Sequence, residues 1–155
     1  PSLREMRENQ VFKHILVPVD GSENALVALE KAVDLQKLCG AKLTILTIYR
    51  HHSMLEASFS MVRPQEPENM DDIMRGAAKE VAEHAKASAV ELGASDARAF
   101  VKNGPVARNI VTFAEEHSVD LIVIGSRGMG SIERYLLGSV SHKVTGTASC
   151  PVLVV

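Results

Sequence analysis

Five short apolar runs are spaced along the chain, and a helical pattern follows each of the first four. They are His14–Val19, Leu43–Ile48, Arg98–Val101, Leu121–Ile124 and Pro151–Val155. Four of the runs are nearly continuous and rich in β-branched residues, which is typical of strands buried on both faces of a parallel sheet. Apolar residues make up 46% of the 155 residues, which is enough for the core of one domain.

Apolar residues recur at helical spacing between these runs. The expected helices span residues 24–38, 70–92 and 105–116, with a last one before the fifth run. Gly40 and Gly93 are stop signals for the first two helices, and Pro105 suits the first turn of the third. The order β-α-β-α-β-α-β-α-β implies an α/β fold with a parallel sheet and right-handed crossovers.

The second helix follows a long link. Residues 49–69 have mixed polarity and include two prolines, and links of this length are usually mobile or functional. Within the helix, the apolar spacing predicts one buried face, formed by Ile73, Ala77, Val81 and Ala85.

Charge and cysteine content exclude several classes of protein. Lys plus Arg total 17 against 19 Asp plus Glu, and the net charge of -2 gives no bulk attraction to nucleic acid or to an anionic membrane. The chain has no apolar run long enough for a membrane span. Residues 1–12 form a charged extension that lacks the apolar core of a signal peptide. Cys39 and Cys150 fit neither a disulfide framework nor a zinc site, so we expect two free thiols in a cytoplasmic protein.

Glycines crowd the segment after the fourth run: Gly125, Gly128, Gly130 and Gly138. Ligands of open parallel sheets bind at the carboxyl ends of the strands, and a helix that begins there presents N–H groups to phosphate. Apolar residues continue at helical spacing from 132 to 144, but Gly138 lies among them and costs a helix about 1 kcal/mol. We therefore expect the helix to begin near Gly138 and Ser139, with Ser139 as N-cap or hydroxyl donor, after an arm over residues 129–137.

Other interpretations of this segment carry less weight. Gly125 and Gly130 have the spacing of a P-loop, but Ser131 stands where that motif requires lysine. No Gly-x-Gly-x-x-Gly follows any expected strand, so a dinucleotide site of that type is unsupported. A glycine-rich loop that only turns the chain remains an alternative.

The histidines give no metal or catalytic site. His52 and Glu56 have the i, i+4 spacing of metal ligands on a helix face, but two ligands are too few. A solvated loop is the simpler interpretation, and no Ser-His-Asp arrangement can be argued from the spacing.

Several stretches together resemble the ATP-binding subgroup of the universal stress protein family. The glycine segment has the pattern Gly-x2-Gly-x9-Gly-Ser, and the first run has the sequence Ile-Leu-Val-Pro-Val-Asp-Gly-Ser. The remaining similar stretches are Gly104-Pro105, Asp120–Gly125 and Cys150–Val155. The resemblance extends from about Lys13 to Val155 as a single domain and leaves out the extension and the link.

The resemblance implies an open five-stranded parallel sheet of order 3-2-1-4-5 with helices on both faces, as in Rossmann-like folds. The switch point then lies between the first and fourth strands. The implied phosphate-binding residues are Gly128, Gly138, Ser139 and Val140. The implied adenosine-binding residues are Pro18, Val19, Asp20 and Ile48, the last through its backbone.

Three further residues of the glycine loop complete the expected nucleotide site: Gly125, Arg127 and Gly130. Arg127 could add positive charge beside the phosphates or face solvent. Asp20 could instead cap the first helix, but Ser22 is the better cap, which favours a ligand role for Asp20.

These features favour an ATP-binding sensor or regulator over an enzyme, because no dedicated general base is evident and the glycine motif has no lysine. ATP could carry Mg²⁺ on its phosphates. The alternatives are a slow ATPase or related nucleotide-processing enzyme on the same fold, and a dimerising module that binds no nucleotide. Residues 151–155 form an apolar edge strand, from which we expect a homodimer. We expect neither nucleic acid nor a membrane as a partner.

Overall fold

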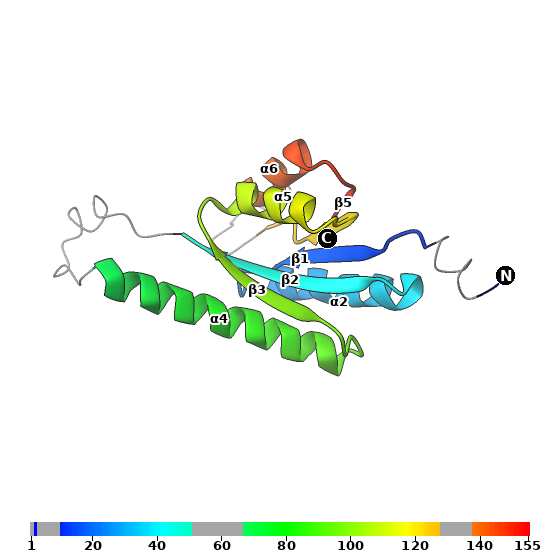
Figure 1. Ribbon diagram of the computed structural model, residues 1–155, viewed down its shortest axis with the longest axis horizontal. Helices are drawn as coiled ribbons and strands as arrows, with labels where there is room; N and C mark the ends of the chain where they lie inside the picture. Colours follow the sequence, from blue (N-terminus) through cyan, green and yellow to red (C-terminus); the bar gives the residue numbers. More distant parts are fainter. Residues whose placement is uncertain (1, 3–9, 51–66, 128–137) are drawn as a thin grey trace.

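The computed structural model describes residues 2, 10–50, 67–127 and 138–155. Strands and helices alternate along the chain in the predicted order (Figure 1). They are β1 (His14–Pro18), α2 (Glu23–Cys39), β2 (Lys42–Tyr49), α4 (Pro67–Glu91), β3 (Arg98–Asn103), α5 (Val106–Glu116), β4 (Leu121–Ile124), α6 (Ser139–Thr147) and β5 (Val152–Val154).

The five strands form one parallel sheet of order β3-β2-β1-β4-β5, which confirms the predicted fold class. Helices α2 and α4 cover one face of the sheet, and α5 and α6 cover the other (Figure 1). Because β1 is followed in space by β2 on one side and β4 on the other, the switch point lies between β1 and β4.

The two faces of the sheet have cores of different composition. The core beneath α2 and α4 is rich in alanine, whereas the core beneath α5 and α6 is built mainly from larger side chains such as Leu16, Ile110 and Phe113. Small side chains let a helix approach the sheet closely, which suits the long helix α4.

Helix α4 differs from its predicted form. It begins at Pro67 and ends at Glu91, whereas residues 70–92 were expected. Its buried residues are Ala78, Ala82, Ala85 and Ala89. Ile73 is 58% exposed, and Ala77 is also exposed, so the predicted face was wrong over the first half of the helix. The physical reason is that alanine forms the face against the sheet but also lies on the exposed face, as at Ala77 and Ala87, so its spacing does not identify the buried side.

The ends of the other helices follow the sequence more closely. Ser22 caps α2 by accepting a hydrogen bond from the backbone N–H of Ala25 at 3.2 Å. Gly40 ends α2 as its C-cap. Pro105 is the N-cap of α5 rather than a residue of its first turn, because the helix begins at Val106. In the described part of the chain, no helix is both long and apolar enough to cross a membrane.

Side chains close the amino end of the sheet. The carboxylate of Asp120 accepts hydrogen bonds from the backbone N–H groups of Lys13 and His14, at 2.8 and 2.9 Å. The ring of His14 contacts the hydroxyl of Thr44 through Nε2 at 2.8 Å and the carbonyl of His117 through Nδ1 at 3.1 Å. This end of the sheet is therefore held together by its own polar groups.

Candidate functional site

The loop after β4 and the start of α6 are tied together at the carboxyl end of the sheet. The backbone N–H of Gly138 donates to the carbonyl of Ser126 at 2.6 Å. The N–H of Ser126 donates in turn to the carbonyl of Val155 at 2.8 Å. The first part of the glycine segment, the last helix and the chain's final strand thus meet at one point.

Helix α6 begins where the glycine pattern predicts. Gly138 is its N-cap, with φ -60° and ψ 156°, and no side chain caps it among the described residues. The first intrahelical bond runs from the N–H of His142 to the carbonyl of Gly138. Ser139 is therefore the first helical residue, and its prediction as N-cap was wrong by one position. The N–H groups of the first turn lie before that bond and can bind an anion.

Ser141 holds this helix start in place. Its hydroxyl is 3.0 Å from the carbonyls of both Ser126 and Gly138, to which it can donate, and the residue is only 2% exposed. The sequence analysis missed this residue. The available signal was a serine at the third helical position, two residues after the Gly-Ser pair, where a hydroxyl can reach back to the preceding loop.

Gly125 is required by close packing. A Cβ atom at this position would lie 3.0 Å from the carbonyl oxygen of Asn24, in the first turn of α2. The absence of a side chain lets the end of β4 pass directly beside the start of α2. Its predicted contact with nucleotide stays a prediction. Arg127 is half-buried at the end of this stretch.

At the end of β1, polar groups organise the turn into α2. The carboxylate of Asp20 accepts a hydrogen bond from the N–H of Ser22 at 2.9 Å. Ser22 rather than Asp20 caps the helix, as predicted. Pro18 is the last residue of the strand and is half-buried, while Val19 is buried and its N–H donates to Leu46.

The backbone of Ile48 faces the space beyond β1. The carbonyl of Leu46 points to the β1 side, where it accepts from Val19, and the carbonyl of Tyr49 points to the β3 side, where it accepts from Gly104. Because backbone groups alternate between the two edges of a strand, Ile48 shares the edge of Leu46. Pairing with β1 ends at Pro18, opposite Leu46. The polar backbone groups of Ile48 therefore point past the end of β1.

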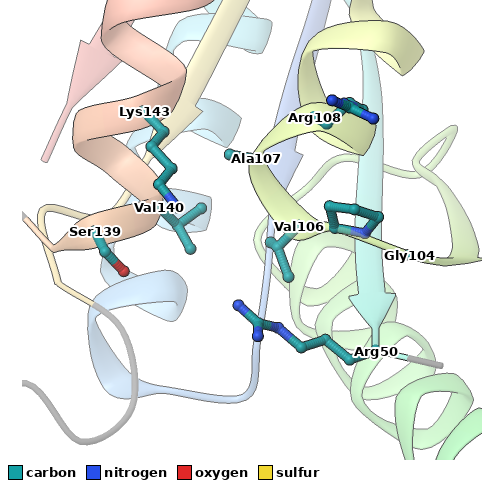
Figure 2. A pocket seen from close by; sticks show the side chains of 9 residues that line it. Arg50, Gly104, Val106, Ala107, Arg108, Ser139, Val140 and Lys143 are labelled. Atoms are coloured by element: carbon teal, nitrogen blue, oxygen red, sulfur yellow. The ribbon is translucent and has the colours of Figure 1, made fainter. Parts of the chain in front are cut away.

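A cavity of about 530 Å³ opens between α5 and α6 at this end of the sheet (Figure 2). Its lining combines small and apolar residues with three basic ones: Arg50, Gly104, Pro105, Val106, Ala107, Arg108, Ser139, Val140 and Lys143. The backbone of Gly104 has φ +123°, which side chains rarely allow, so the cavity wall depends on glycine there.

The structure brings only some of the predicted residues to this cavity. Ser139 and Val140 line it. Seven described residues do not: Pro18, Val19, Asp20, Ile48, Gly125, Arg127 and Gly138. Gly128 and Gly130 lie outside the described residues, as does the arm over 129–137. The sequence analysis missed Arg50 and Lys143, which no local motif marks.

The family profile described as "Universal stress protein family" matches residues 12–155, almost the whole chain. The chain belongs to the universal stress protein family. The curated relative YxiE of Bacillus subtilis, a universal stress protein, is 38% identical over 148 residues, which cover 94% of this chain and 99% of the relative. The family resemblance expected from the sequence is therefore confirmed.

Solved universal stress proteins share this fold. UspA from Lactobacillus plantarum superposes with a TM-score of 0.78 at 26% identity, over 92% of this chain and 97% of UspA. Another universal stress protein, solved in complex with cAMP, gives a TM-score of 0.67 at 27% identity, over 93% of this chain and 96% of that one. That relative binds an adenine nucleotide.

The described residues of this universal stress protein provide no metal site. Within them, no group of three or more His, Cys, Asp or Glu side chains is placed to hold a metal ion. His52 and Glu56 lie outside the described residues. Cys39 and Cys150 are free cysteines.

Proposed function

We propose that this universal stress protein binds ATP at the carboxyl end of its sheet and acts as a nucleotide-dependent regulator in a stress response. The observation that carries the proposal is the start of α6, which follows its N-cap Gly138 and whose first two residues, Ser139 and Val140, line a cavity. A helix start with its first N–H groups available, next to a residue without a side chain, is a phosphate site. The relative that binds cAMP supports an adenine nucleotide as the ligand.

The residues at this end fit the parts of ATP. The first turn of α6 and the hydroxyl of Ser139 bind phosphate oxygens. The outward backbone edge of Ile48 offers an N–H and a carbonyl to adenine, and Asp20 lies at the end of β1 for the ribose. Mg²⁺ carried on the phosphates would neutralise part of their charge, because this cation prefers oxygen ligands.

The proposed role is regulatory rather than enzymatic. Fast phosphoryl transfer needs placed charge and an oriented nucleophile. Asp20, Arg127 and Ser139 are the candidates that the sequence supplies, and no dedicated general base is evident beside them. We therefore expect any ATP hydrolysis to be slow. A cytoplasmic location is part of the proposal, and the two free thiols support it.

A homodimer through β5 is also part of this proposal. The strand lies at the edge of the sheet and pairs with β4 on its other side. Leu153 in its centre is 36% exposed. An apolar edge strand has unpaired backbone N–H and C=O groups that can pair with a strand of another chain. The same strand of a second copy can pair with them under two-fold symmetry.

Light scattering tests the dimer, since the monomer mass is 16.8 kDa. We expect twice this mass for the wild type and the monomer mass or aggregation for Leu153→Lys, because a buried unpaired lysine is costly. Val27→Lys is the control, since Val27 is 50% exposed on α2, away from β5. A monomer mass for the wild type across micromolar concentrations would refute the dimer.

Titration calorimetry tests the main proposal. ATP should bind with micromolar affinity, which corresponds to about -8 kcal/mol, and should raise the melting temperature, since it binds the folded state alone. Absence of both heat and thermal shift at millimolar ATP would overturn the proposal. Steady-state hydrolysis at roughly 10 per second, typical of enzymes, would overturn the regulatory role while leaving ATP binding intact.

A further inference from the structure

We propose that Arg50 and Lys143 make the cavity selective for the length of the phosphate chain, so that ATP binds more tightly than ADP and ADP more tightly than AMP. This rests on the proposed function, because it assigns a specificity to the same site. It adds two residues that lie outside the glycine motif, on two different elements.

The two cations enter the cavity from opposite sides. Arg50 follows the last residue of β2, and Lys143 lies in the second turn of α6. Figure 2 shows the side chain of Lys143 running along α6 toward Val140, while the side chain of Arg50 reaches toward Val106. Both charged ends therefore point to the space beside the start of α6, where the phosphates are proposed to bind.

The charge of the cavity differs from that of the whole chain. The chain has a net charge of -2, yet the described residues that line the cavity include three basic side chains and no acidic one. The dipole of α6 adds partial positive charge at the same end. Each added phosphate brings more negative charge to these groups, so the attraction grows from AMP to ATP.

The two side chains contribute in different ways. The guanidinium of Arg50 is planar and can bind two phosphate oxygens side by side, whereas the ammonium of Lys143 acts as a compact point charge. Both residues are exposed at the cavity rim, so salt should screen their attraction. The N–H groups of the first turn of α6 donate hydrogen bonds to the phosphate nearest to them, so these hydrogen bonds change little with the length of the phosphate chain.

Arg108 provides a control within the same cavity. It also lines the wall, but its guanidinium points away from α6 in Figure 2. Its charge should therefore add little to the difference between ATP and AMP. Lys86 provides a second control, because it is exposed on α4, which covers the other face of the sheet.

The test is calorimetry of ATP, ADP and AMP with the wild type and with Arg50→Gln and Lys143→Gln. Each variant should bind ATP about tenfold more weakly, a loss of about 1.4 kcal/mol. Affinity for AMP should change by less than about twofold, because hydrogen bonds to the start of α6 remain. The ratio of ATP to AMP affinity should also fall as salt rises.

Lys86→Gln should keep the wild-type ratio of ATP to AMP affinity, and Arg108→Gln should lower it by less than either test variant. The inference is wrong if the two test variants weaken ATP and AMP equally, if they weaken neither, or if the control variants lower the ratio as much. In each of these cases ATP still binds the wild type and the proposed function stands. If no nucleotide binds the wild type, the proposed function and this inference both fail.

Discussion

The two ends of the sheet differ in whether a side chain of the protein accepts hydrogen bonds from the backbone N–H groups there. At the amino end, the N–H groups of Lys13 and His14 are bound by the carboxylate of Asp120. At the carboxyl end, α6 begins at Gly138 with no side-chain cap among the described residues. Buried or half-buried N–H groups need acceptors, so an end that lacks its own is suited to take them from a ligand.

The two ends also differ in the charged side chains that they carry. The amino end combines one carboxylate with a half-buried histidine ring that contacts Thr44. The carboxyl end gathers Arg50 and Lys143 around the first turn of α6. One end is complete without a partner, and the other has the charge of an anion site. We therefore expect substitutions at the amino end to affect stability and substitutions at the carboxyl end to affect binding.

The largest expected effect is that of Gly138→Val at the carboxyl end. The φ of -60° at this position is open to any residue, so the fold should persist, but the added side chain should occupy the phosphate position. ATP affinity should fall by more than about a hundredfold, or roughly 3 kcal/mol, in calorimetry. Gly146→Val is the matched control on the same helix, because a Cβ at Gly146 meets nothing within 4 Å. Normal ATP binding by Gly138→Val would show that the helix start is not the phosphate site.

A smaller effect, on stability alone, is expected for Asp120→Ala at the amino end. The variant leaves the N–H groups of Lys13 and His14 without their carboxylate and should lower the free energy of unfolding by about 2 kcal/mol. Urea denaturation measures this loss, and ATP affinity of the folded variant should stay unchanged. Asp120→Asn, which keeps one acceptor oxygen, should lose less. An equal loss of ATP affinity would mean that the two ends are not independent.

The smallest effect concerns pH and His14. Burial lowers the pKa of His14 below its ordinary value of 6.5, and the charges of Lys42 and His117 lower it further, while the carbonyl of His117 and the charge of Asp120 oppose the shift. The folded state therefore favours the neutral ring. Its contribution to stability is complete above pH 6.5 and is lost as pH falls below that value toward the pKa of the folded state.

Unfolding free energies measured from pH 7 down to about 5 check this, because histidine titrates in that window. The wild type should lose stability more steeply than His14→Gln across this range. Identical slopes for the two proteins would contradict the assignment. ATP affinity should show no matching difference between them, since His14 lies at the opposite end of the sheet.

The sequence predicted most of the fold because the fold depends on local patterns. Continuous β-branched runs are typical of buried parallel strands, and a glycine that follows a helical pattern, such as Gly40, marks the end of the helix. Gly138 predicted the start of α6 within one residue for the same reason. The strand order came from the family resemblance, because alternation of strands and helices is compatible with several orders.

The parts that escaped prediction depend on contacts between distant segments. Ser141 matters because the loop after β4 passes beside it, and Arg50 and Lys143 matter because β2 ends and α6 begins near one cavity. No spacing of residues within the sequence indicates which distant segments come into contact. The buried face of α4 was predicted wrongly over its first half because alanines lie on both the buried and the exposed side of this helix, and packing against the sheet decides between them.

Amide chemical shifts of the labelled protein during ATP titration test the central claim most directly, because they report on both ends of the sheet in one sample. We predict that the largest shifts occur at Ile48, Ser139 and Val140, while His14 and Asp120 stay within the noise. Shifts centred on His14 and Asp120, or the absence of any shift at saturating ATP, would contradict the division between a closed amino end and a nucleotide-binding carboxyl end.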